Sequence, residues 1–114
     1  MVAARLNYLE LPVADVSRSA AFYGTAFGMD FTPFAPTYAA TMTGDTDIGL
    51  QADDSERTRG PLPVIEVDDL EAAENAVRNA GGEIIVPVFA FPGGRRFHFV
   101  DPDGHELAVA QAGP

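Results

Sequence analysis

The sequence repeats a pattern of residues after 54 positions, and this repeat constrains the fold more than any other feature. In each half an apolar residue, an acidic residue two positions later and a glycine thirteen positions after the acid keep the same separations. They are Val13, Asp15 and Gly28 in the first half and Val67, Asp69 and Gly82 in the second. Such a duplication predicts two copies of one supersecondary unit.

The segment between the acid and the glycine has helical periodicity in both halves. Apolar residues recur at spacings of three and four over 16–27 and 70–80, which predicts two amphipathic helices. Asp15 and Asp69 are expected to cap their amino ends, with Asp68 as the alternative for the second helix. The expected left-handed residues that end the helices are Gly28 and Gly82.

Short alternating apolar runs bounded by turn residues flank both helices and predict strands. They are 6–13, 29–34, 38–42 and 48–51 in the first half, and 62–67, 83–88, 96–100 and 106–110 in the second. The order in each half is strand, helix and three strands, so a single domain over 1–114 divides into module one, 1–52, and module two, 60–111. One helix leaves the other face of a four-stranded sheet uncovered, so a second unit or a ligand has to bury it. A shared concave cavity is expected.

Composition excludes several classes of function. The 114 residues are 46% apolar, which is enough for a packed core. There is no cysteine, so thiol chemistry and thiolate metal ligands are excluded. The net charge of -10, with seven arginines and no lysine, would repel nucleic acid and suits cationic or neutral small ligands. Because no apolar stretch is long enough for a bilayer span or a signal peptide, a cytoplasmic protein without a membrane partner is expected.

Several short motifs occur in one order along almost the whole chain. They are Leu9–Asp15 running into Ser19–Tyr23, Phe27–Gly28, Val67–Leu70 followed by Ala80–Gly82, and Phe97–Gly104. In this order and spacing they resemble the vicinal oxygen chelate superfamily, which includes glyoxalase I, extradiol dioxygenases, fosfomycin-modifying thiol transferases and bleomycin resistance proteins. The resemblance implies an α+β fold in which two βαβββ modules form a half-open eight-stranded barrel. It also implies a homodimer.

Metal-using members of that superfamily hold their ion with histidines or carboxylates at four strand positions. Counting from the repeated acids and from the last turn glycine places these on Tyr8, Leu62 and Ala108, with Gly49 or the nearby Gln51 as the fourth. None of these residues supplies the imidazole or carboxylate that a divalent ion needs. When the family's ligand positions are transferred to this sequence, they therefore predict no metal site and no cofactor, and they disfavour Lewis-acid chemistry.

Strand parity places a set of side chains on the cavity face. The expected catalytic residues are His98, Arg96 and Tyr8, and the expected ligand-binding residues are Glu10, Gln51, Leu62, Val64, Glu66, Phe34, Tyr38 and Ala108. The position of His98, three before the Asp-Pro-Asp-Gly turn, lines the pocket in the fosfomycin-modifying relatives. Histidine is the best acid or base near neutral pH, and Arg96 or Tyr8 would hold an oxyanion.

Plainer interpretations of the same residues stay open. Glu10 and Glu66 are equally well explained as solvated carboxylates at a rim, and Arg96 as the ion-pair partner of one of them. His98, between two phenylalanines, also suits a core histidine bonded to backbone. The aromatic segment 31–38 carries more apolar surface than an exposed connection tolerates, so the core or a dimer partner is expected to cover it.

Taken together, these features predict a glyoxalase- and bleomycin-resistance-like protein that binds a small organic ligand in a cavity between the modules without a metal ion. Two alternatives stay open. One is a drug-sequestering protein of the bleomycin-resistance kind, which needs no chemistry. The other is a metal-dependent lyase or dioxygenase of the same superfamily. If the protein is an enzyme, the resemblance implies an activity of lyase, transferase or isomerase kind.

Overall fold

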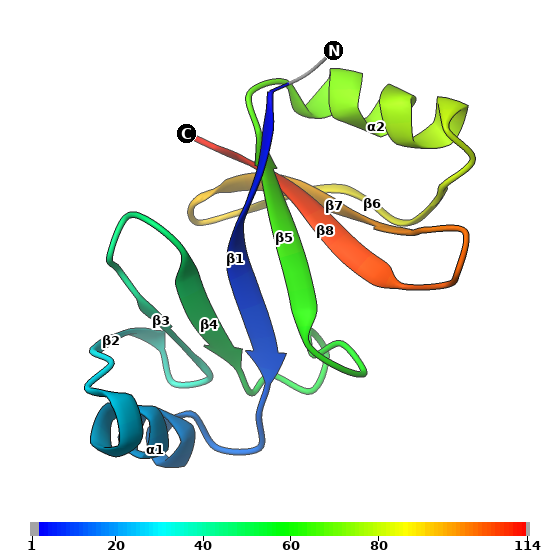
Figure 1. Cartoon of the computed structure of the whole chain (residues 1–114). Coiled ribbons are helices and arrows are strands. Elements are labelled where there is room, and N and C mark those ends of the chain that lie inside the picture. Colours follow the sequence, from blue (N-terminus) through cyan, green and yellow to red (C-terminus); the bar gives the residue numbers. More distant parts are fainter. Residues whose placement is uncertain (1–2, 114) are drawn as a thin grey trace. The chain divides into compact units, whose positions relative to one another are not determined.

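The computed structural model describes residues 3–113, so Met1, Val2 and Pro114 at the ends of the expected domain lie outside the described range. Within it the elements follow the predicted order, strand, helix and three strands, twice over (Figure 1). The chain divides into two compact units, residues 8–62 and residues 3–7 with 63–113. In the described part of the chain no helix has the length and apolar character needed to cross a membrane.

The 8–62 unit is a four-stranded sheet with one helix. Its elements are β1 (Ala4–Pro12, which enters the unit at Tyr8), α1 (Val16–Phe27), β2 (Phe31–Ala35), β3 (Tyr38–Thr41) and β4 (Asp47–Gln51). The strands lie in the order β2-β3-β4-β1, and only the β1–β4 pair is parallel. The core forms between sheet and helix around the buried residues Leu50, Ala39 and Val16. Because side chains alternate along a strand, Gly49 and Gln51 face away from α1.

The 63–113 unit repeats this plan. Its elements are β5 (Leu62–Val67), α2 (Leu70–Asn79), β6 (Glu83–Phe91), β7 (Gly94–Val100) and β8 (Glu106–Ala112). The strands lie in the order β5-β8-β7-β6, again with one parallel pair, β5–β8. Phe97, Val109 and Val67 pack against Leu70 and Ala73 of α2. Arg96 and His98 therefore lie on the opposite face of the sheet.

Both predicted amino-terminal caps are confirmed. The side chain of Asp15 accepts a hydrogen bond from the amide of Arg18, and that of Asp69 accepts from Ala72. Both cap residues have extended backbone, as a helix start requires. Asp69, and not its neighbour Asp68, is therefore the cap of α2.

The predicted helix ends are right for α1 and wrong by one residue for α2. Gly28 is left-handed, with a φ of 71°. In α2 the left-handed residue is Gly81, with a φ of 97°, and not Gly82. The amide of Gly82 donates to the carbonyl of Val77, and that of Gly81 to Arg78. These two bonds form a Schellman motif. In this motif the left-handed residue, Gly81, comes directly before the residue whose amide makes the longer-range bond, Gly82.

The hairpin between β6 and β7 is longer than the sequence predicts. Both strands continue through Phe89 and Phe91, which pair with Arg96 and Gly94. A glycine is needed at 94 because its φ is 154° and a side chain there would overlap the carbonyl oxygen of Gln111. The segment 89–94 is thus part of an extended strand pair.

Candidate functional site

Three polar side chains form a hydrogen-bonded cluster on the face of the 8–62 sheet that is turned away from α1. Tyr8 and Glu10 come from β1, and Tyr38 comes from β3. The Tyr38 hydroxyl donates to Oε1 of Glu10 at 3.2 Å, and the hydroxyls of Tyr8 and Tyr38 are hydrogen-bonded to each other. The structure thus brings together three of the predicted site residues, which we call the tyrosine–glutamate cluster.

Gly49 makes room for this cluster. It stands opposite Glu10 in the β1–β4 register, and a Cβ on it would overlap the hydroxyl oxygens of Tyr8 and Tyr38. Glu10 is only 2% exposed, so it is not a solvated rim carboxylate. Burial, and then the nearby Tyr8 and Glu10, raises the pKa of Tyr38 far above its ordinary value of 10.0, because a phenolate here would lose its hydration beside negative groups. Tyr38 therefore stays a neutral hydrogen-bond donor.

A histidine–glutamate pair lies on the 63–113 sheet, on the face turned away from α2. Nδ1 of His98, on β7, is 2.8 Å from Oε2 of Glu106, on β8. The β7–β8 register pairs His98 with Ala108 and Val100 with Glu106, so the two side chains are diagonal neighbours on one face. His98 is 4% exposed. Its Nε2 is buried and has no hydrogen-bond partner among residues 3–113.

Arg96 lies on the same face, two residues before His98. Its guanidinium carbon is 5.3 Å from the ring centroid of Phe89 and 5.7 Å from that of Phe91, both on β6. The Phe89 ring is also 5.9 Å from the His98 ring. Such cation–π contacts hold a guanidinium in place, more firmly as water is excluded. The result is a buried cation and a buried imidazole in fixed positions on one sheet face.

Three other predicted ligand-binding residues have apolar side chains. Leu62, Val64 and Ala108 are all buried. Ala108 on β8 is paired with Val64 on one side and with His98 on the other. Because alanine carries only a methyl group, Ala108 adds little bulk beside His98.

The last predicted ligand-binding residues are in different surroundings. Gln51 is buried, and its Oε1 accepts from a backbone amide two residues further on. Glu66 is exposed, as a rim carboxylate would be. Phe34 is 58% exposed, whereas Phe31 packs near the Tyr23 ring, with centroids 6.3 Å apart. The core of the chain therefore covers the start of the aromatic segment but not Phe34.

The four positions that the superfamily resemblance assigns to metal ligands do not offer a divalent ion a suitable donor set. The Tyr8 phenol is bonded to Tyr38, Gly49 has no side chain, and Leu62 and Ala108 are hydrocarbons. Ions of this kind need several imidazole, carboxylate or thiolate groups that converge. The residues present do not fit a metal at this place.

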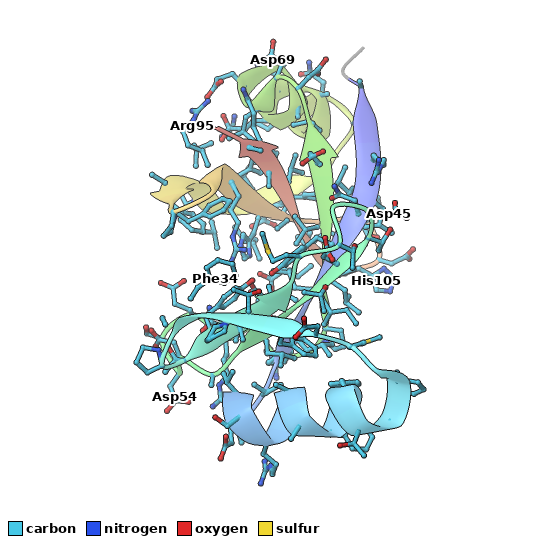
Figure 2. All side chains as sticks on the ribbon, turned by 90° about the vertical axis from the view of Figure 1, so that its left-hand side faces the viewer. Phe34, Asp45, Asp54, Asp69, Arg95 and His105 are labelled. Atoms are coloured by element: carbon cyan, nitrogen blue, oxygen red, sulfur yellow. The ribbon has the colours of Figure 1, made fainter. Side chains whose placement is uncertain are left out.

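Another group of potential ligands lies in the turn between β7 and β8. One atom each of Asp101, Asp103 and His105 lie within 4.8 Å of one another. Oδ1 of Asp101 accepts from the amides of Asp103 and His105, and Oδ2 lies 3.0 Å from Nδ1 of His105. Figure 2 shows His105 at the surface. These bonds are those of a tight turn and account for the cluster without an ion.

Sequence reasoning missed the partners of the two central side chains. Glu106 is two residues before Ala108 on the same strand, so the sequence predicts that both side chains lie on one face of the sheet. The pairing of Glu106 with His98 depends on the register between strands, which the sequence does not show. Phe89 and Phe91 lie beyond the predicted strand 83–88, between it and the predicted strand 96–100. A run of aromatic residues alternating with smaller ones up to position 91 was the signal that could have extended it.

Fold and site together define an α+β protein of two βαβββ modules. Residues 5–109 match the family model described as Glyoxalase/Bleomycin resistance protein/Dioxygenase superfamily. The chain therefore belongs to this superfamily, as its motifs predict.

Solved structures are similar to the chain at low identity. The NAD-dependent benzaldehyde dehydrogenase from Legionella pneumophila is 23% identical, with 94% of this chain and 99% of that chain covered and a TM-score of 0.77. Methylmalonyl-CoA epimerase from Mycobacterium tuberculosis is 18% identical, with 96% of this chain and 88% of that chain covered and a TM-score of 0.74. The Mn(II)-bound glyoxalase from Novosphingobium aromaticivorans is 21% identical, with 96% of this chain and 40% of that chain covered and a TM-score of 0.68. These likenesses confirm the predicted fold class. A comparison with curated proteins gave no match.

Proposed function

We propose that the chain binds a small carbonyl compound against the sheet face that carries Arg96 and His98, without a divalent metal ion, and exchanges a proton with it. The observation that carries this proposal is the state of His98. One ring nitrogen is paired with a carboxylate, and the other is buried without a partner among residues 3–113. Buried polar atoms are nearly always hydrogen-bonded. An unpartnered buried nitrogen therefore marks a place for a ligand group.

Glu106 determines which nitrogen of His98 is basic. A carboxylate only accepts, so Nδ1 carries the proton and donates to Oε2, which leaves Nε2 as an acceptor. The same carboxylate stabilises the imidazolium that forms when Nε2 takes a proton. A base oriented by a third group is the arrangement that acid–base catalysis uses.

Arg96 supplies the positive charge for the anion that develops. It shares its sheet face with His98 and is 9% exposed, so little water competes for it. Nε2 of His98 takes a proton from the carbon next to a carbonyl group. The C–H electron pair forms a carbon–carbon double bond, and the π pair of the carbonyl group moves to its oxygen, which gives an enolate beside Arg96. Return of the proton to carbon gives an isomerised product, whereas loss of a neighbouring leaving group gives a lyase product.

Proton exchange with solvent tests this proposal directly. A panel of 2-oxo acids and acyl thioesters is incubated with the protein in D₂O, and loss of the hydrogen next to the carbonyl is followed by NMR. At least one compound should exchange, and His98→Gln should lower the exchange rate by about 100-fold or more, the usual size of a general-base effect. Glu106→Gln should lower it by a smaller factor, because the ring keeps a partner but loses the charge.

The chain provides its own matched control, since His105 is its other histidine and is exposed. His105→Gln should leave the exchange rate unchanged. Equal rates in the His98→Gln variant and the unaltered protein would remove His98 from the mechanism. A rate that falls with EDTA and returns with zinc or manganese would instead support the metal-dependent alternative.

A binding-only function is the second candidate, and the net charge of -10 favours it for cationic drugs. It predicts that metal-free bleomycin raises the melting temperature at micromolar concentration, while no compound of the panel exchanges.

The superfamily resemblance further leads us to propose a homodimer in the cytoplasm. Sedimentation should then give about twice the 12.1 kDa chain mass.

A further inference from the structure

The side chains on either side of His98 in its sheet are hydrocarbons. The strand register places Val86 of β6 opposite His98 on one side and Ala108 of β8 on the other, and Val64 of β5 follows beyond Ala108. Paired residues lie on the same face of a sheet. One row across these neighbouring strands therefore consists of Val86, His98, Ala108 and Val64, and the imidazole is its only polar side chain.

The row surrounds the unpartnered nitrogen of His98 with apolar groups. Ala108 and Val64 are 0% and 5% exposed, and Nε2 of His98 is itself buried. The Phe89 ring lies 5.9 Å from the imidazole ring. The carboxylate of Glu106 is bonded to Nδ1, the other ring nitrogen. A group bound at Nε2 therefore has hydrocarbon beside it along the row.

These surroundings discriminate between the substituents that a reacting carbon can carry. A carbon that gives its proton to Nε2 lies close to the ring, so its substituent lies close to the row. A hydrocarbon substituent is stabilised by burial there. A hydroxyl or charged substituent would lose its water without finding a partner in the row, which is unfavourable. An apolar site disfavours such a hydroxyl-bearing analogue by up to about 100-fold.

We infer that the substrate is a carbonyl compound whose reacting carbon carries a hydrocarbon group instead of a hydroxyl or a charged group. The inference rests on the proton exchange proposed for His98 and narrows its substrate class. The side chains that determine the preference are Val86, Ala108 and Val64, which all belong to the 63–113 unit.

Two compounds that differ at one position test this preference. 2-Oxobutanoate carries a methyl group on the carbon that loses its proton, and 3-hydroxypyruvate carries a hydroxyl group in its place. Binding to the whole chain is followed by NMR of protein with nitrogen-labelled histidine, in which His105→Gln assigns the signals. 2-Oxobutanoate should shift the Nε2 signal of His98 in a saturable way. It should bind about 10-fold or more tighter than 3-hydroxypyruvate.

Val64→Thr places a hydroxyl group in the row with little change of shape. It should narrow the preference by about fivefold, because the hydroxyl of 3-hydroxypyruvate gains a partner. Val67→Thr is the matched control, since Val67 is on the same strand, is 6% exposed and packs against α2 on the other face. It should lower the melting temperature by a similar amount and leave the preference unchanged. If Val64→Thr does not fold, the preference of the unaltered protein decides.

Hydrogen exchange of the same two compounds in D₂O separates this inference from the proposed function. Tighter binding of 2-oxobutanoate without exchange would contradict proton transfer by His98 and support the preference. Exchange together with equal binding of the two compounds would overturn the inference alone. The inference is also wrong if neither compound shifts the His98 signals at about 10 mM, or if folded Val64→Thr keeps the full preference.

Discussion

The two histidines of the chain show that burial, rather than a carboxylate partner, separates a candidate base from a surface residue. Nδ1 of His98 is paired with Glu106, and Nδ1 of His105 with Asp101, at similar distances of 2.8 and 3.0 Å. The difference lies at Nε2. His105 is exposed, so water satisfies its nitrogen, whereas the described residues leave that of His98 without a partner. Only His98 has a reason to bind something else.

The exposed pair should make stability depend on pH. The hydrogen bond that His105 donates to Asp101, and then the charge of Asp101, raises the pKa of His105 above 6.5. Hydrogen bonds from His105 likewise lower the pKa of Asp101 below 3.8. A raised histidine pKa stabilises the fold fully below 6.5, and this gain is lost as pH rises through the folded value. A lowered aspartate pKa stabilises above 3.8, and this gain is lost as pH falls through the folded value. The pair should therefore stabilise most between about pH 4 and 6.5.

NMR titration of the imidazole protons checks this pH dependence. In Asp101→Asn the pKa of His105 should fall back toward 6.5, and denaturant unfolding should show a larger loss of stability at about pH 5 than at about pH 9. Because both groups are solvated, the difference is small. A loss that grows with rising pH would contradict the assigned partners.

For single residues, the sequence predicts the sheet face on which a side chain lies better than it predicts which residue that side chain contacts. Strand parity correctly separates Phe97 on the α2 side from Arg96 and His98 on the other. It does not specify that Glu106 reaches His98 or that Phe89 lies beside Arg96, because those contacts depend on register between strands. Likewise, Gly49 has no side chain to suggest a role, and only the three-dimensional arrangement shows which hydroxyls occupy its space.

Among the elements, the helices are the best predicted because their boundaries have local causes. A side-chain cap and a left-handed glycine act within one turn, and both can be recognised in the sequence. The single error, Gly82 for Gly81, arises because two adjacent glycines satisfy the same pattern. Strands are less well bounded, and β6 continues to Phe91, where it still pairs with Gly94 of β7.

Loss of a helix cap should have a measurable effect on stability. Asp69→Ala removes the side chain that accepts from the amide of Ala72, and should lower the free energy of unfolding by about 1 kcal/mol. Urea unfolding followed by circular dichroism measures this. Asp68→Ala is the matched control, since that neighbouring carboxylate is exposed and does not cap. Equal losses in the two variants would show that only charge near the helix, and not the hydrogen bond, matters.

For the whole molecule, the excess of negative charge should make stability depend on salt. Seventeen acidic side chains stand against seven arginines, so unlike-charge pairs cannot offset all of the repulsion. Raising the ionic strength from about 0.01 M to 0.1 M shortens the screening length from about 30 Å to about 10 Å. The melting temperature should rise over this range in sodium chloride. A fall would mean that the ion pairs, such as Arg95 with Glu71, outweigh the repulsion.

The parallel strand pairs have a consequence for how the protein is made. β1 pairs with β4 at Tyr8 and Asp47, and β5 pairs with β8 at Val64 and Ala108. The first strand of each repeat can therefore form this pairing only after the last strand of the same repeat has been synthesised. A growing polypeptide emerges from the ribosome one residue at a time, and each sheet can be completed only after roughly 40 further residues have been synthesised. Until then the apolar side of the leading strand is exposed to chaperones. The repeated architecture therefore gives two such intervals of similar length instead of one longer interval.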